Sequence, residues 1–305
     1  MTAALLAGYA FLVGVGAPYA LARARWAHHA PRLAVLVWHG LMVTFVVTVA
    51  LVLYHVTLRE RHVHDGLLGL LTACGLLPGA SAFGPAPHTA ADPASLLPPA
   101  LVVLLPVGWF LRTVWRTRRA QRRHLDMLAM VGRPSPEHDA VVVDHETPAV
   151  YCLPGRFRRV VVTRGALRVL SREQFHAVLA HERAHIIGRH HLCHAATEAF
   201  ERAFPKLPLA RHAREQTALL LEMAADDRAL RSHSRETLAA ALCEVAAGQA
   251  PRAALGAGGP SAAIRLHRLL TPKAAPHRAI RLGIVGGCLA GPLLPLLIAC
   301  GPVLG

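Results

Sequence analysis

The chain has 305 residues, of which 53% are hydrophobic and 17% are charged. Soluble globular domains carry about 25% charged residues, and the mean hydropathy here is +0.37, so this composition is unusual for a soluble protein and predicts membrane-spanning segments. The six cysteines are scattered without a Cys-x-x-Cys pair, which argues against a disulfide framework and against a cysteine-based zinc site.

Four apolar runs are long enough to cross a bilayer, which takes about 20 helical residues. They cover Ala3–Ala22, Leu33–Val56, Leu96–Trp115 and Leu282–Leu304. The first run has no basic segment in front of it and is followed by arginines, so we interpret it as an uncleaved anchor rather than a signal peptide. A fifth apolar segment, Gly66–Leu77, is too short to span alone and is predicted to be re-entrant or interfacial.

The net charge of +15 comes almost wholly from arginine, and the basic residues gather next to the predicted spans. They lie between the first and second runs (Arg23, Arg25, Arg32), after the third (Arg116, Arg118, Arg119, Arg122, Arg123) and before the fourth (Lys273, Arg278, Arg281). By the positive-inside rule, the region between the third and fourth runs lies in the cytoplasm and both termini lie outside. Position thus explains the basic excess, and nucleic acid is not expected as a partner.

The predicted organisation is a membrane region with three spans (residues 1–115), a cytoplasmic domain (116–281) and a fourth span (282–305). The cytoplasmic domain opens with an arginine-rich helical continuation of the third run. A small β meander is predicted next, from Ala140–His145, Ala149–Leu153 and Arg159–Thr163. Helices follow, and the last is a short one that ends near Leu270, after a flexible loop at 254–260.

One predicted helix carries the segment "VLAHERAHIIGRHH", Val178–His191. Ser171 and Gln174 fit a capping box, which places the start of this helix at Ser171. His181 and His185 then project from the same face, one turn apart. Two neutral imidazoles at this spacing can bind one Zn²⁺ at about 2.0–2.1 Å, and Glu182 lies beside them. This is the H-E-x-x-H pattern.

A second predicted helix, "EQTALLLEMAADDRALR", offers an acidic third ligand. Glu222 lies among apolar residues, where a carboxylate needs a metal or an arginine opposite it. Asp226 follows one turn later and can accept a hydrogen bond from the ring of a zinc-bound histidine. The alternative is an exposed acidic helix whose carboxylates pair with Arg228 or Arg231.

Three further histidines, His190, His191 and His194, lie close to the motif in the sequence. They do not have the H-E-x-x-H-x-x-G-x-x-H spacing that a third histidine ligand normally shows. We therefore favour a solvated helix end over additional metal ligands.

The order "TPAVYCLPGRFRRVVVTRGALRVLSREQFHAVLAHERAH", followed by "EMAADDRAL", resembles the membrane zinc peptidases of the BlaR/MecR type. The resemblance implies a mainly α-helical, multi-pass cell-membrane protein, with an α+β zincin-type metallopeptidase domain between the third and fourth spans. It also implies one Zn²⁺ per chain, with His181, His185 and Glu222 as ligands and Glu182 as general base. Those sensor-transducers carry an extracellular penicillin-binding domain after the fourth span, whereas this sequence ends at Gly305, so direct β-lactam sensing is not expected.

The predicted function is a zinc metalloendopeptidase that cuts a cytosolic or juxtamembrane protein in regulatory proteolysis. A membrane quality-control protease of the HtpX/Ste24 type, which shares the same motifs, is the alternative within the class. A signal transducer without catalysis is the alternative outside it, and the intact Glu182 favours an enzyme because a transducer needs no general base. The expected partners are a protein or peptide substrate and the lipid bilayer, and a homo-oligomer is left open.

Two details of the site stay open at this point. Tyr151, His190 and Arg265 are candidates for stabilising the oxyanion, each with an ordinary surface or packing role as the alternative. An edge strand beside a zinc helix can hold an extended peptide through main-chain hydrogen bonds. Arg159–Thr163 is the strand we expect in this role, with an ordinary core strand as the alternative.

The arginine asymmetry makes the topology testable. Alkaline phosphatase fused after Gly305 should be active, since we expect that end to be extracytoplasmic, whereas the same reporter inserted at 254–260 should be inactive. Reporter activity on whole cells measures both. Finding both positions on one side of the membrane would contradict the four-span arrangement.

Overall fold

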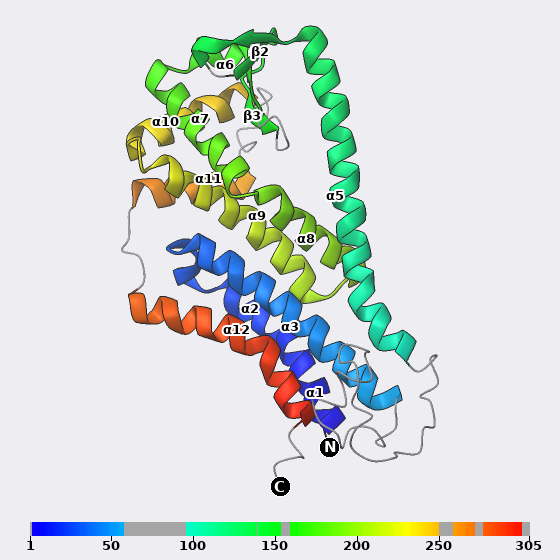
Figure 1. The fold of residues 1–305 in the computed structure, drawn as a ribbon. Helices are drawn as coiled ribbons and strands as arrows, with labels where there is room; N and C mark the ends of the chain where they lie inside the picture. The colour runs from blue at the N-terminus through cyan, green and yellow to red at the C-terminus, as the bar shows by residue number, and fades with distance from the viewer. Residues whose placement is uncertain are drawn as a thin grey trace, which may run out of the picture.

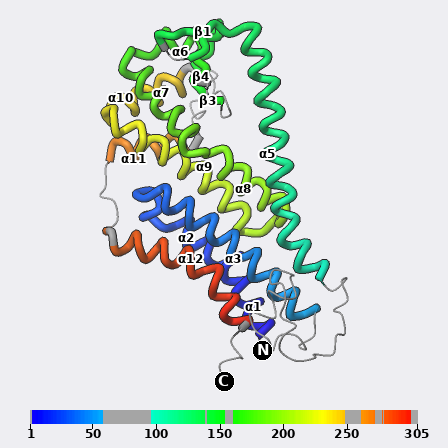
Figure 2. Tube along the Cα trace, viewed as in Figure 1, coloured from blue at the N-terminus to red at the C-terminus, as the bar shows by residue number. Residues whose placement is uncertain are grey.

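The computed structural model describes residues 2–57, 96–138, 140–153, 159–249, 259–271 and 277–300. Within these ranges the chain is mainly helical, with one small sheet. Long apolar helices pack together at the end of the molecule where α1 begins and α12 ends, and the sheet lies at the opposite end (Figure 1, Figure 2). The predicted segment at 66–77 and most of the loop at 254–260 lie outside the described residues.

Four apolar helical stretches in the described ranges are long enough to cross a membrane, by length and composition. The first consists of three consecutive helices: α1 (Thr2–Phe11), the π-helix η1 (Leu12–Gly16) and α2 (Ala17–Ala22). The other three are α3 (Pro31–Thr57), α5 (Leu97–Val131) and most of α12 (Arg278–Cys300). Each overlaps a predicted run. The arginine-rich continuation of the third run is helical, as predicted, so α5 carries the chain from the apolar region to the sheet without a break.

Helix α3 is central among the apolar helices, because α1, α5 and α12 all pack against it. Trp38 of α3 is only 1% exposed, and Leu6, Leu51 and Ala299 form a buried cluster that joins α1, α3 and α12. Other apolar side chains of these helices face outward, among them Leu101, Leu104 and Leu111 of α5. Apolar surface of this kind fits contact with lipid.

Helices α8 (His190–Ala203) and α9 (Pro208–Ala229) form a hairpin that packs along the apolar helices. At its tip, the rings of Phe200 and Phe204 meet Phe45 of α3 edge-on, with centroids 6.1 and 5.4 Å apart. Leu207, between the two helices, lies so close to Gly14 that a Cβ there would be 3.3 Å from its Cδ1. The hairpin and the apolar helices therefore share one hydrophobic core.

The sheet has four strands in the order β1-β2-β4-β3. These are β1 (Arg133–Ser135), β2 (Ala140–Val143), β3 (Val150–Leu153) and β4 (Arg159–Thr163). β4 runs parallel to β2 and antiparallel to β3. The predicted meander is therefore wrong in its order, and the expected edge strand at 159–163 is an inner strand. β3 lies at the edge of the described sheet instead.

The loop at 144–149 explains this order, because it crosses the end of β4. The Thr163 hydroxyl accepts a hydrogen bond from the N–H of Ala149 and donates one to the carbonyl of Thr147, both at 2.9 Å. The N–H of Gly165 donates to the carbonyl of His145 at 3.0 Å. These bonds hold the loop across β4, so that β3 pairs on the far side.

Four more helices complete the described chain: α6 (Arg164–Val169), α7 (Arg172–Ile187), α10 (Arg235–Gln249) and α11 (Gly259–Leu270). α7 starts as predicted, since the Ser171 and Gln174 side chains each accept a hydrogen bond from the other's backbone N–H. Leu170 and Phe175 join the apolar cluster formed with β4. α7 is thereby fixed against the sheet, and α9 packs against it as well.

The crossing loop leaves no room for a side chain at position 165. A Cβ added there would lie 1.8 Å from the carbonyl oxygen of Glu146, and the backbone would have to move. We expect Gly165→Ala to destabilise the sheet by ~1–3 kcal/mol or more, as overpacking does, and to lower the melting temperature in detergent. Gly108→Ala, where the added Cβ meets nothing within 4 Å, is the matched control. Equal melting of both variants would contradict the role assigned to the loop.

Candidate metal centre

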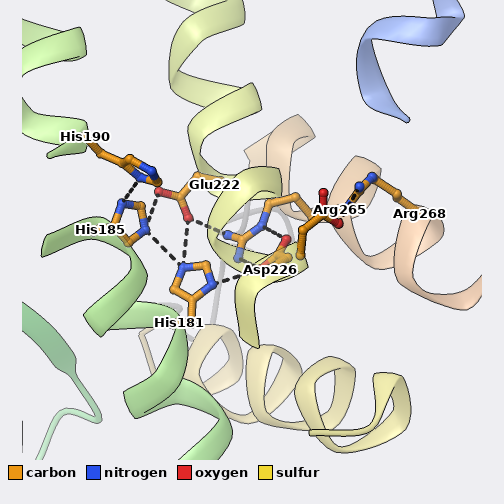
Figure 3. Close-up of polar contacts among 8 residues, drawn as sticks. His181, His185, His190, Glu222, Asp226, Arg265 and Arg268 are labelled. Carbon is orange, nitrogen blue, oxygen red and sulfur yellow. Dashed lines mark hydrogen bonds and ion pairs between the residues drawn. The ribbon is translucent and has the colours of Figure 1, made fainter. Parts of the chain in front are cut away.

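Helices α7 and α9 bring His181, His185 and Glu222 to one point (Figure 3). The Nε2 atoms of the two histidines are 3.2 Å apart. Each lies 3.4 Å from an oxygen of Glu222, Oε2 for His181 and Oε1 for His185. Ligand atoms at about 2.0–2.1 Å from a tetrahedral zinc ion are about 3.3 Å from one another. The spacing of these donors therefore fits the ion that the sequence motif predicts.

Asp226 lies behind this group, on the side of His181 away from Glu222. Its Oδ1 is 3.0 Å from Nδ1 of His181, and the residue is fully buried. The predicted proximity of Asp226 to a site histidine is thus present in the structure. The alternative of an exposed acidic helix is wrong for this residue, because its partners are His181 and an arginine from another helix.

That arginine is Arg265 of α11, which holds both carboxylates. Its Nε and Nη2 donate to the two oxygens of Asp226 at 2.9 and 2.7 Å, and its Nη1 lies 2.9 Å from Oε2 of Glu222. From the sequence we expected Arg265 only as a candidate for stabilising the oxyanion. Arg265 and Arg268 lie one turn apart on a short helix, and they pair with the adjacent Asp226 and Asp227. Two arginines at this spacing and two adjacent aspartates were the sequence pattern that could have predicted the pairing.

The charges of the group balance one another. Burial disfavours the charged form of His181, but hydrogen bonds to Asp226 and Glu222 outweigh it and raise its pKa to about 9. Burial also disfavours the ionised carboxylates, yet the pKa of Glu222 falls to about 2 because of His181 and Arg265. The pKa of Asp226 falls to about 2 through the same two partners. His181 and Arg265 therefore compensate for the buried negative charge of Glu222 and Asp226.

Glu182 lies between α7 and the edge strand β3. Its Oε2 accepts a hydrogen bond from the backbone N–H of Cys152 at 3.0 Å. Burial and the negative charge of Glu222 raise the pKa of Glu182, against the opposing effect of His181. A carboxylate with a raised pKa, held beside a metal site, is suited to accept and return a proton.

His190 does not lie at a solvated helix end, which corrects the expectation for this residue. It is 7% exposed, and its Nδ1 is 2.9 Å from Nδ1 of His185. Burial and the neighbouring His185 lower the pKa of His190 to about 4. His191 and His194 are half-buried, and neither is part of the donor group of three in the described chain.

Tyr151 of β3 has its hydrogen-bond partner on α5. Its hydroxyl forms a hydrogen bond with Nε2 of His124 on α5 at 2.9 Å. The structure therefore gives Tyr151 a partner that links the sheet to α5. Of the three candidates for stabilising an oxyanion, Arg265 and His190 lie at the donor group and Tyr151 is tied elsewhere.

Removing Glu222 tests the donor group directly. Two histidines alone make a poor zinc site, so Glu222→Ala should lose nearly all zinc, measured by elemental analysis of purified protein. Asp226→Asn should keep the site but weaken zinc affinity by about 10–100-fold, as is typical when the hydrogen-bond partner of a metal-bound histidine is changed. Glu215→Ala, on the exposed side of α9, should bind zinc normally. Stoichiometric, tight zinc in Glu222→Ala would move the third ligand elsewhere, with His190, His191 and His194 as the nearest candidates.

Comparison with known protein families supports a metallopeptidase site over part of the chain. Residues 114–218 match Peptidase family M48. The matched segment contains the sheet and the whole of α7, with His181, Glu182 and His185, and it ends just before Glu222. Neither the curated proteins nor the solved structures give a match. The match does not show membership of the BlaR/MecR type. What it does support is that this chain contains a metallopeptidase region of the zincin type.

Proposed function

We propose that this protein is a membrane-anchored zinc endopeptidase that cuts a cytosolic or juxtamembrane protein in regulatory proteolysis. The observation that carries the proposal is the convergence of two Nε2 atoms and a carboxylate, with Glu182 on the same helix. A buried arginine explains why Glu222 is tolerated, but it does not explain why two imidazoles point at the same carboxylate. A shared metal explains both.

Zinc in this group would supply a Lewis acid, which polarises a carbonyl and lowers the pKa of water. The chain's own contribution is to hold and move a proton. Glu182 would accept the proton of the attacking water and pass it to the leaving amine. The N–H of Cys152 fixes one oxygen of this carboxylate, which orients Glu182 before a substrate arrives.

The edge strand β3 supports a mode of substrate binding. It pairs with β4 on one side, and the N–H of Cys152 points to the other side, towards Glu182. An extended peptide added along this edge would lie beside the general base and be held by main-chain groups of the strand other than the N–H of Cys152, which donates to Glu182. The role expected for 159–163 thus passes to β3.

The membrane setting rests on the apolar helices and on the arginine distribution. Four helical stretches are long and apolar enough to span, and arginines lie between the first two, after the third and before the fourth. By the positive-inside rule, residues 116–281 would face the cytoplasm. The donor group joins α7 to α9, and α9 packs on α3, so the proposed cleavage would occur close to the membrane.

The general base separates an enzyme from a transducer that only keeps the fold. Glu182→Gln should bind zinc as the wild type does, because Glu182 is not one of the three donors, but should lose peptide cleavage, because an amide cannot accept the proton. We expect at least a 10²–10⁴-fold loss, measured on a fluorescently labelled unfolded protein with the full chain in detergent.

Glu173→Gln is the control, since Glu173 is exposed in the first turn of the same helix. It should cleave at the wild-type rate. Cleavage by Glu182→Gln at the wild-type rate would remove Glu182 from the mechanism. A wild-type protein that binds zinc but cleaves nothing would favour the transducer.

A further inference from the structure

Each of the two site histidines has a neighbour at both ring nitrogens. Nε2 faces the donor group, and Nδ1 faces a side chain on the other side of the ring. Nδ1 of His181 faces the carboxylate of Asp226 at 3.0 Å. Nδ1 of His185 faces Nδ1 of His190 at 2.9 Å. Figure 3 shows the two partners on opposite sides of the donor group. His190 thus takes the same place for His185 that Asp226 takes for His181.

The chain reverses sharply to put His190 there. α7 ends at Ile187, and Arg189 adopts a left-handed backbone conformation with φ 50° before α8 begins at His190. A Cβ on Gly188 would lie 2.4 Å from Nε2 and 2.5 Å from Cδ2 of His190. Glycine at this position therefore leaves the space that the His190 ring occupies against the end of α7.

The contact between two Nδ1 atoms has a definite polarity once a metal is bound. A hydrogen bond between two ring nitrogens needs one proton, carried by one of them. Coordination through Nε2 requires neutral His185 with its proton on Nδ1, so His185 donates and His190 accepts. Partners of this kind orient a metal-bound imidazole, and they are ordinarily carboxylates, carbonyls or water.

We propose that His190 is a positioning residue for the metal site, which accepts the Nδ1–H of His185 and fixes that ring with Nε2 towards the metal. The proposal rests on the zinc site of the proposed function. His190 is not a fourth donor in this arrangement, because its Nδ1 meets the side of the His185 ring opposite Nε2. Within the described residues the donor group is His181, His185 and Glu222.

Two substitutions of His190 separate positioning from packing. His190→Leu fills the space without an acceptor and should weaken zinc binding by about 10–100-fold. His190→Asn places an amide oxygen near the position of Nδ1 and should restore affinity to within a few-fold of wild type. Zinc affinity is measured by chelator competition on the full chain in detergent, and the visible spectrum of the Co²⁺ form reports the ligand geometry. The half-buried neighbour provides a control, since His191→Leu should leave both readouts unchanged.

Unchanged zinc affinity in His190→Leu would overturn the proposal. So would equal losses in the Leu and Asn variants, since those would indicate a packing role. If His190→Leu does not fold, the hydrogen bond is tested in the wild-type protein. Its zinc form, labelled with ¹⁵N-histidine, should show a protected Nδ1–H on His185, and absence of that proton would overturn the proposal. A wild-type chain that binds no zinc would instead refute the proposed function together with this inference, whereas tight zinc in His190→Leu refutes the inference alone.

Discussion

The ion pair between Asp226 and Arg265 is the interaction on which the site depends. The side chain of Asp226 is 1% exposed and that of Arg265 is 11% exposed, and the pair joins α9 to α11 across 39 positions of the sequence. Burying a charge costs several kcal/mol unless a partner and further hydrogen bonds compensate for it. The bidentate contact, together with His181 and Glu222, supplies that compensation. Removal of Arg265 would leave Asp226 and Glu222 with only His181 as a partner among these four groups, so the four groups stabilise one geometry together.

The same helices tie the site to the membrane-spanning part of the molecule. Arg268, one turn after Arg265, donates to Asp227 and to the carbonyl of His28, both at 2.6 Å. His28 lies in η2 (Arg25–His28), the 3₁₀ turn between the first two apolar stretches. A contact of this kind fixes the donor group relative to the start of α3.

Packing extends this connection deep among the apolar helices. The tip of the α8–α9 hairpin contacts Phe45, which is 13 residues along α3 from Arg32, or about 20 Å at 1.5 Å per residue. The region predicted as a cytoplasmic domain thus shares its core with α3 through Trp38, Leu220 and Met223. α3 and α9 thus belong to one hydrophobic core, and α9 carries Glu222 and Asp226.

Local chemistry was readable in the sequence because each signal lies within a few residues. Ser171 and Gln174 fix the start of α7, a 3.6-residue period puts His181 and His185 on one face, and uninterrupted apolar runs predict the long helices. The presence of Glu222 and Asp226 near these histidines could be predicted from their spacing and from the cost of a carboxylate among apolar residues. The capping box, the helical spacing and the apolar runs depend on neighbours in the chain, and Glu222 and Asp226 could be predicted because a buried carboxylate needs a partner.

What the tertiary structure alone decided depends on segments that meet from far apart. The position of β4 between β2 and β3 results from a loop held by Thr163 and by the absence of a side chain at Gly165. The pairing of Arg265 with Asp226 results from how α11 packs on α9, and no local rule specifies that packing. His190 reaches His185 only because the chain reverses through a left-handed residue, where helical periodicity no longer predicts direction. The sequence by itself determined which groups could form the site, and packing between distant helices determined which of them meet.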